Sequence, residues 1–231
     1  MPETVAVAEF GSAPNERTPR KSLVFSPNWR SPVRLWIKRL LDVVVSAALL
    51  FLLAPVFLIL SIAVKLGSPG PVFYRWKVVG QGGRPFTGYK FRSMVANADQ
   101  LRAHLEARNE MSGPMFKVTN DPRITRIGAW LRKYSLDELP QLFSVLKGDM
   151  SLVGPRPPLV TEYQRFSEFQ TQKLAVKPGI TCLWQVNGRN QISDFDEWVG
   201  LDLEYIERWS LRLDAAILIR TAAAVFSGSG R

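Results

Sequence analysis

Apolar residues fill one long stretch near the start of the chain and recur at helical spacing further on. Residues 43–64 carry no charge over about 22 positions, just long enough to cross a bilayer core as a straight helix. Pro55 lies near the middle, and basic residues such as Arg39 and Lys65 flank both ends. A plain transmembrane helix is the alternative. The proline and the basic flanks favour a re-entrant membrane hairpin over residues 34–66, broken at Pro55, that enters and leaves on the cytoplasmic face.

The remaining pattern divides the chain into three further parts. Residues 1–33 are rich in Pro, Ser, Thr, Asn and charge, so we expect a disordered arm. Residues 67–226 predict one compact domain of class α+β, mainly helical, with a tail at 227–231. Residues 71–79 suit either a strand or a segment along the membrane surface, and residues 89–94 suit a strand. The expected helices are 96–109, 124–133, 161–173 and 196–226, the last range forming one or two helices. The second and last of these helices are amphipathic and suit either the membrane interface or ordinary packing.

The charge balance restricts the class of partner. A net charge of +10 and a pI near 10.0 suit nucleic acid, an anionic membrane lipid surface or phosphorylated substrates. The sequence has no helix-turn-helix, zinc-finger or RNP-type pattern, so we expect no nucleic-acid partner.

The chain has one cysteine, Cys182, and one histidine, His104, which exclude an internal disulfide, a His-based zinc site and a serine-histidine hydrolase. Carboxylate chemistry is therefore the main catalytic option that remains. Cys182 is expected to be a small buried side chain. The sequence leaves the oligomeric state open.

The candidate chemistry lies in residues 135–158, where two acids open an apolar run. Asp137 and Glu138 are predicted to lie in the first turn of a short helix that stops near Gly148. Ser135 and Glu138 also match a capping box, which is the purely structural alternative.

Pro140 disfavours a helix capped by Ser135, because proline fits only a first turn. A start between residues 137 and 139 places the Asp137 carboxylate near unpaired backbone N–H groups that favour its ionised form. Such a carboxylate is a nucleophile or a metal ligand.

Basic residues near these acids suggest phosphoryl chemistry. Mg²⁺ is commonly held by one or two carboxylates plus substrate phosphates, so Asp137 and Glu138 are the predicted metal ligands. Arg156 is fixed between two prolines and could present its planar fork to a phosphate. Lys90 and Arg92 would share one face of a strand, either for phosphate contact or as a solvated basic face.

Three ordered segments resemble a known family. They are SLDELPQLFSVLKGDMSLVGPRP from residue 135, YKFRSM from residue 89 and KPGITCLWQVNGRN from residue 177. Together with the preceding apolar stretch, they resemble the bacterial sugar transferases called monotopic phosphoglycosyl transferases. The resemblance implies transfer of a sugar 1-phosphate from a UDP-sugar to polyprenyl (undecaprenyl) phosphate at the bacterial inner membrane, which initiates polysaccharide assembly. At 231 residues the chain looks like a minimal-size member.

The resemblance also assigns roles to residues. Arg189 is carried over as a donor-binding residue, and Trp184, Gln185 and Asn187 suit a nucleobase and diphosphate. Two positions depart from the family pattern. Ala54 replaces a serine before the break proline, and Cys182 replaces a glycine.

The expected mechanism is a two-step displacement. Asp137 attacks the β-phosphate, UMP leaves, and the polyprenyl phosphate then attacks the phosphosugar-aspartyl intermediate. Arg156, Arg189 and Mg²⁺ offset phosphate charge, while Glu138 either assists the metal or deprotonates the acceptor. Two other classes stay open: a non-catalytic basic membrane protein, and a lipid-acceptor glycosyltransferase that releases UDP.

Overall fold

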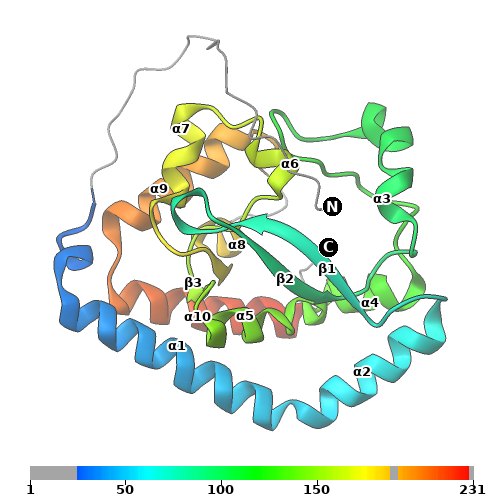
Figure 1. Cartoon of the computed structure of the whole chain (residues 1–231), viewed down its shortest axis with the longest axis horizontal. Helices are drawn as coiled ribbons and strands as arrows, with labels where there is room; N and C mark the ends of the chain where they lie inside the picture. Colours follow the sequence, from blue (N-terminus) through cyan, green and yellow to red (C-terminus); the bar gives the residue numbers. More distant parts are fainter. Residues whose placement is uncertain (1–24, 188–191, 229–231) are drawn as a thin grey trace, which may run out of the picture.

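Two helices joined by a bend run along one face of the molecule (Figure 1). The structure is a computed structural model that describes residues 25–187 and 192–228. Helix α1 spans Pro32–Leu52 and helix α2 spans Ala54–Gly67, and their axes differ by 63°. The break falls at Leu53, whose N–H still bonds to a carbonyl of α1.

Pro55 lies in the first turn of α2, where its missing N–H costs no intrahelical hydrogen bond. The chain therefore breaks two residues before the proline. Within the described part of the chain, no single helix is long and apolar enough to cross a membrane, whereas α1 and α2 together meet that requirement. The helix-break-helix is confirmed, and its re-entrant placement stays a prediction.

The first half of α1 is bound into the body of the molecule by buried polar groups. Lys38 Nζ donates to Asp214 Oδ2 at 2.7 Å and to the Val153 carbonyl at 3.1 Å. Asp42 Oδ1 accepts from the Leu152 N–H at 2.9 Å. Because buried charges need such partners, these contacts fix α1 against the centre of the fold.

Two small sheets hold the loops that follow. Strands β1 (Phe73–Val79) and β2 (Pro85–Phe91) form an antiparallel hairpin, so residues 71–79 contain a strand, one of the two expected alternatives. Gly82 and Gly83 have φ of 65° and 77°, a region that glycine enters without strain, and so allow the turn. Strands β3 and β4 pair in parallel. The remaining elements are η1 (Pro27–Arg30), η2 (Gln81–Gly83), α3 (Ala98–Leu101), η3 (Ala103–Arg108), α4 (Arg126–Lys133), η4 (Leu136–Glu138), α5 (Gln141–Lys147), β3 (Ser151–Val153), α6 (Val160–Tyr163), α7 (Glu168–Thr171), η5 (Gln172–Ala175), β4 (Gly179–Thr181), α8 (Leu183–Val186), α9 (Phe195–Arg208) and α10 (Leu211–Ser227).

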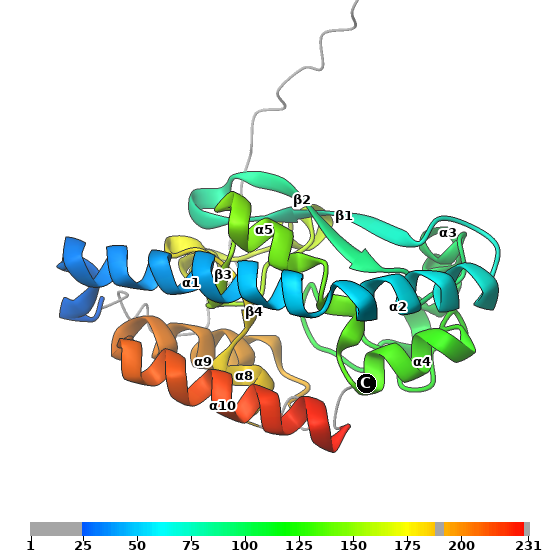
Figure 2. The same cartoon turned by 90° about the horizontal axis from the view of Figure 1, so that it is seen from below.

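The buried apolar residues form two clusters. The larger one joins β3, α8, α9 and α10 and includes Val153, Leu183, Tyr205, Trp209 and Ile217. The smaller one joins α2, β2 and α4 and includes Leu60, Val64, Phe91 and Leu131. Figure 2 shows α10 running beside the bent pair on the same face of the molecule. The fold is mixed α and β, mainly helical and compact, as expected.

Some residues that were expected to lie in the disordered arm belong to the fold. Residues 25–33 belong to the fold, because Ser26 Oγ donates to the Trp209 carbonyl at 2.9 Å and the Trp29 indole stacks on Trp209. The expectation of a disordered arm over residues 1–33 is therefore wrong for residues 25–33. Residues 1–24 lie outside the described residues.

Several helix boundaries differ from the expected ones. Residues 96–109 form the short pieces α3 and η3, since two leucines provide too little packing for a continuous helix. Residues 161–173 are divided because Ser167 and Gln170 form a capping box that starts α7. Residues 196–226 contain two helices, α9 and α10, in agreement with the expectation of one or two. The stop at Gly148 is confirmed, with φ of 94°.

Candidate active site

The two acids lie on a turn of 3-10 helix ahead of α5 and not in its first turn. η4 spans Leu136–Glu138, and α5 begins only at Gln141, after Pro140. The predicted start between residues 137 and 139 is therefore wrong, because α-helical hydrogen bonding begins after the proline, which has no N–H to donate. Ser135 adopts a left-handed conformation, and its side chain does not cap the helix, so the capping-box alternative is wrong as well.

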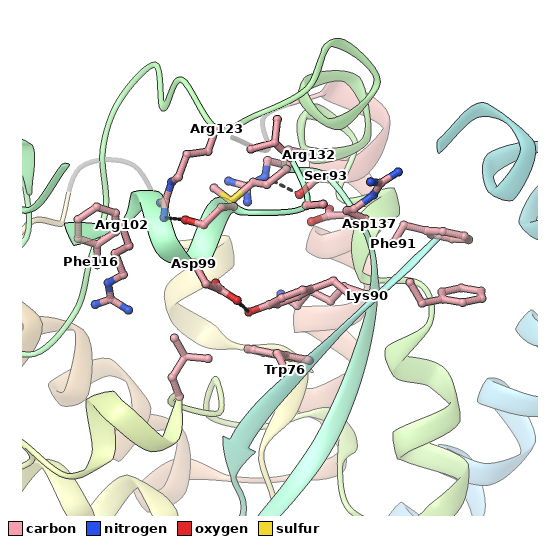
Figure 3. Close-up of a pocket in the computed structure, with 18 of the residues that line it drawn as sticks. Trp76, Lys90, Phe91, Ser93, Asp99, Arg102, Phe116, Arg123, Arg132 and Asp137 are labelled. Atoms are coloured by element: carbon pink, nitrogen blue, oxygen red, sulfur yellow. Dashed lines mark hydrogen bonds between the residues drawn. The ribbon is translucent and has the colours of Figure 1, made fainter. Parts of the chain in front are cut away.

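A cavity of about 280 Å³ opens in front of Asp137 (Figure 3), and it is named the polar cavity for the charged side chains in its lining. Asp137 itself is only 8% exposed. The cavity lies between the β1–β2 hairpin, the segment after β2 and the turn after β3. The charged residues that line it are Lys90, Arg92, Asp99, Arg102, Arg123, Arg132, Asp137, Arg156 and Glu162. Arginine and lysine thus outnumber the acids, which suits a polyanionic ligand.

Glu138 joins two of the predicted basic residues. Lys90 Nζ donates to Glu138 Oε1 at 2.7 Å, and Arg156 approaches the same oxygen at 3.8 Å. The Lys90 ammonium also lies 4.2 Å from the centre of the Trp76 ring. Burial lowers the pKa of Lys90, and the Glu138 carboxylate partly offsets this effect. The structure therefore brings Lys90, Arg156, Asp137 and Glu138 together.

Arg132 is a site residue that the sequence analysis missed. It lines the cavity, and its Nε donates to Ser93 Oγ at 2.9 Å. Burial lowers its pKa, while the charge of Asp137 acts in the opposite direction. Gly128 allows this approach of α4, since a Cβ there would lie 1.8 Å from the Ser93 carbonyl oxygen. The glycine in an otherwise periodic helix was the signal in the sequence.

Arg92 follows β2 and binds backbone carbonyls at the end of α2. Its guanidinium donates to the carbonyls of Ser68 at 2.7 Å and Val64 at 3.2 Å, and it also bonds to the Pro69 carbonyl. The strand ends at Phe91, so Arg92 lies just outside it, but Lys90 and Arg92 line the same cavity. Arg92 lines the cavity and holds the end of α2, where a cation favourably meets the unpaired carbonyls. Its phosphate contact stays a prediction.

The third motif, residues 177–190, was expected to contact a nucleobase and diphosphate, and two of its side chains instead contact other parts of the protein. Trp184 is 6% exposed and stacks on Trp198 with ring centres 3.8 Å apart, so its ring is not open to a nucleobase. Asn187 accepts from Arg220 at 3.1 Å. Arg189 lies outside the described residues, and its donor contact stays a prediction.

The structure confirms that Cys182 is a small buried side chain, at 1% exposure. Burial raises the pKa of its thiol to about 12. The residue is therefore protonated and shielded in the folded protein.

A second, larger cavity lies on the other side of Asp137 and Glu138, the dyad of adjacent acids. It has a volume of about 710 Å³ and is mostly apolar. The α1–α2 bend contributes Leu49, Leu53 and Val56, and Glu138 and Gln185 also lie in its lining. Asp137 and Glu138 therefore face different cavities.

The oxygen donors around Asp137 decide whether the predicted Mg²⁺ fits this site. In the described residues, no group of three or more His, Cys, Asp or Glu side chains could hold a metal ion. Asp137 lines the polar cavity, where phosphate oxygens of a substrate would complete the coordination that Mg²⁺ prefers. Oε1 of Glu138 is already bound to Lys90. The donor set fits Mg²⁺ at Asp137 in the presence of a diphosphate.

Comparison with known proteins gives several relatives. The chain is 45% identical to "Galactosyl transferase CpsE" of Streptococcus agalactiae over 208 residues, 90% of this chain and 46% of that protein. It is 44% identical to the "Undecaprenyl-phosphate galactose phosphotransferase" of Salmonella typhimurium over 199 residues, 84% of this chain and 41% of that protein. It is 38% identical to the "Exopolysaccharide production protein ExoY" of Rhizobium meliloti over 204 residues, 86% of this chain and 89% of that protein.

The chain spans less than half the length of the first two relatives, and nearly the whole length of the third. The family model described as "Bacterial sugar transferase" matches residues 33–228. This range includes the bent helix pair, the dyad and both cavities, and the chain accordingly belongs to the bacterial sugar transferase family.

Proposed function

We propose that the protein transfers a sugar 1-phosphate from a UDP-sugar to a polyprenyl phosphate and releases UMP. One observation carries this proposal: Asp137 lines a small polar cavity rich in cations, while its neighbour Glu138 lines a large apolar one. An aqueous diphosphate suits the first cavity and a lipid suits the second. Relatives named for transfer to undecaprenyl phosphate support the same substrates.

In the first step, an Asp137 carboxylate oxygen attacks the β-phosphorus of the UDP-sugar. A new P–O bond forms to Asp137, and the bond from the β-phosphorus to the bridging oxygen breaks, so UMP leaves with that oxygen and its electron pair. Lys90, Arg132 and Arg156 surround this position and stabilise the charge that develops on the phosphate oxygens.

In the second step, a phosphate oxygen of the acceptor attacks the same phosphorus. The bond to Asp137 breaks, the carboxylate is restored, and a polyprenyl diphosphate sugar is released. Glu138 lines the apolar cavity and lies beside Lys90, so it is placed to take the acceptor proton and to position that lysine. Mg²⁺ held by Asp137, with Glu138 as the second predicted ligand, would offset diphosphate charge when bound.

The proposed location is the cytoplasmic face of the bacterial inner membrane. Large apolar side chains are exposed along α1, α2 and α10; they include Trp36, Phe51, Leu52, Leu58, Ile59, Leu66, Ile219 and Phe226. Such a surface suits lipid contact. In spheroplasts, Ser12→Cys should stay protected from a membrane-impermeant maleimide, whereas labelling from outside would mean that the helix pair spans. The buried Cys182 keeps the background low.

The nucleotide released by the wild-type protein tests the proposal. Protein in detergent is incubated with Mg²⁺, undecaprenyl phosphate and a panel of UDP-sugars. UMP supports the proposal. UDP would identify a glycosyltransferase, and no nucleotide from any donor would favour the non-catalytic membrane protein.

A further inference from the structure

The apolar cavity has two walls that lie far apart in the sequence. The α1–α2 bend forms one wall, and the C-terminal half of α10 forms the other through Leu218, Ala224 and Val225. Figure 2 shows α10 running beside the bent pair. The volume of about 710 Å³ falls in the range of roughly 300–1,000 Å³ that is typical of ligand sites.

The chemistry of the lining favours a long apolar ligand. Of the described residues that line the cavity, Glu138 and Arg220 carry a charge, and most of the others are aliphatic. Such a surface gains free energy by removing hydrocarbon from water and offers few hydrogen bonds to a polar molecule.

The two ends of the cavity differ. At the mouth, Phe226 lines the cavity and is 86% exposed, so the opening continues into the apolar surface of the molecule. At the inner end, Ser135 and Glu138 lie on the dyad turn, and Glu138 binds Lys90, which already lines the polar cavity. The Glu138 side chain therefore separates the two cavities.

We propose that this cavity binds the isoprenoid chain of the acceptor, with its phosphate directed towards Glu138; this inference rests on the proposed function. The lipid would enter past Phe226, and the α1–α2 bend serves as a wall of the lipid site as well as an anchor.

Filling the cavity tests the inference. Ala224 is half-buried in the lining, and Ala224→Trp adds an indole there. Val56→Phe adds bulk from the opposite wall. Ile219→Trp is the matched control, because Ile219 is 71% exposed on the same helix and does not line the cavity. Each variant is assayed for UMP formation without acceptor and for the KM of undecaprenyl phosphate.

We expect the KM for undecaprenyl phosphate to rise about tenfold or more in Ala224→Trp and Val56→Phe, while UMP formation without acceptor stays unchanged in both. In Ile219→Trp, neither quantity should change. Native mass spectrometry should show less undecaprenyl phosphate retained by both filled variants. An unchanged KM and unchanged retention in both would overturn the inference and leave the function standing. If the wild type forms no UMP, the proposed function fails, and lipid retention alone decides the inference.

Discussion

Lys90 experiences two opposing effects at the residue scale. Burial disfavours its ammonium form, whereas the Glu138 carboxylate at 2.7 Å and the face of Trp76 favour it. The side chain has little freedom between these partners, so its charge is fixed at the edge of the polar cavity. A fixed cation can stabilise a phosphoryl transition state without reorganisation.

Lys90→Met should lower kcat/KM for the UDP-sugar by about 100- to 1,000-fold, the usual cost of losing one preorganised electrostatic group. It also leaves Glu138 without its nearest cation. Lys147→Met is the control, because Lys147 is 73% exposed and its ion pair with Asp149 contributes little. Steady-state kinetics measures the effect, and an unchanged kcat/KM in Lys90→Met would remove this lysine from the site.

The lowered pKa of Lys90 predicts the alkaline side of the pH profile. The charged form is the active one, so activity should fall as pH rises through this pKa, below the ordinary lysine value of 10.5. Lys90→Arg should move the limb to higher pH, since a guanidinium keeps its proton. The profile of kcat/KM against pH measures this. If activity fell over the same alkaline pH range in the wild type and in Lys90→Arg, the titrating group would be one other than Lys90.

At the scale of elements, helix α4 positions Arg132 in the lining of the polar cavity. It can do so because Gly128 allows the helix to pack closely against Ser93 in the segment after β2. The Cβ of an alanine at 128 would lie 1.8 Å from the Ser93 carbonyl oxygen, so the helix must shift. Gly200 in α9 is a matched control, because a Cβ there meets no heavy atom within 4 Å.

Gly128→Ala should lower the free energy of unfolding by about 1–3 kcal/mol and reduce the rate of UMP formation. Gly200→Ala should raise the free energy of unfolding by about 0.5–1 kcal/mol, as expected for alanine in a helix interior. Denaturant unfolding and a UMP assay measure both effects. Equal effects in the two variants would show that the close contact at Ser93 does not fix α4.

The elements themselves were largely predictable from the sequence. The uncharged stretch with Pro55 predicted the bent pair, the apolar run at 71–79 indicated a possible strand, and the adjacent acids indicated the position of the candidate site. These features depend on local periodicity and turn chemistry, which one sequence contains.

The contacts between elements could not be predicted. Periodicity placed Arg132 off the apolar face of its helix but could not reveal that Ser93 lies opposite. The sequence suggested that the Trp184 ring could stack on a nucleobase, whereas in the fold the Trp198 ring covers it. Such assignments depend on tertiary packing, which local patterns do not specify.

At the scale of the whole molecule, one buried ion pair joins the first and last helices. Lys38 in α1 binds Asp214 in α10 at 2.7 Å, and Asp214 also accepts hydrogen bonds from Tyr205 at 2.7 Å and Trp209 at 3.1 Å. The pair sets the distance between the two helices that form the apolar cavity.

Lys38→Met should lower the free energy of unfolding by about 3–5 kcal/mol, because the Asp214 carboxylate is left buried without a cation. Adding Asp214→Asn should recover part of this loss, since the amide is neutral, its oxygen can accept from Trp209, and its NH2 can donate to the Tyr205 hydroxyl. Denaturant unfolding of the single and double variants measures the coupling. A loss below about 1 kcal/mol in Lys38→Met would show that this pair does not fix the helices.

The central claim is that Asp137 is the nucleophile, and intact-protein mass spectrometry after incubation with Mg²⁺ and a UDP-sugar tests it most directly. Without acceptor, we predict a phosphosugar adduct that maps to Asp137, is absent in Asp137→Asn, and disappears when undecaprenyl phosphate is added. UMP formed without any adduct, or an adduct that persists in Asp137→Asn, would contradict the account.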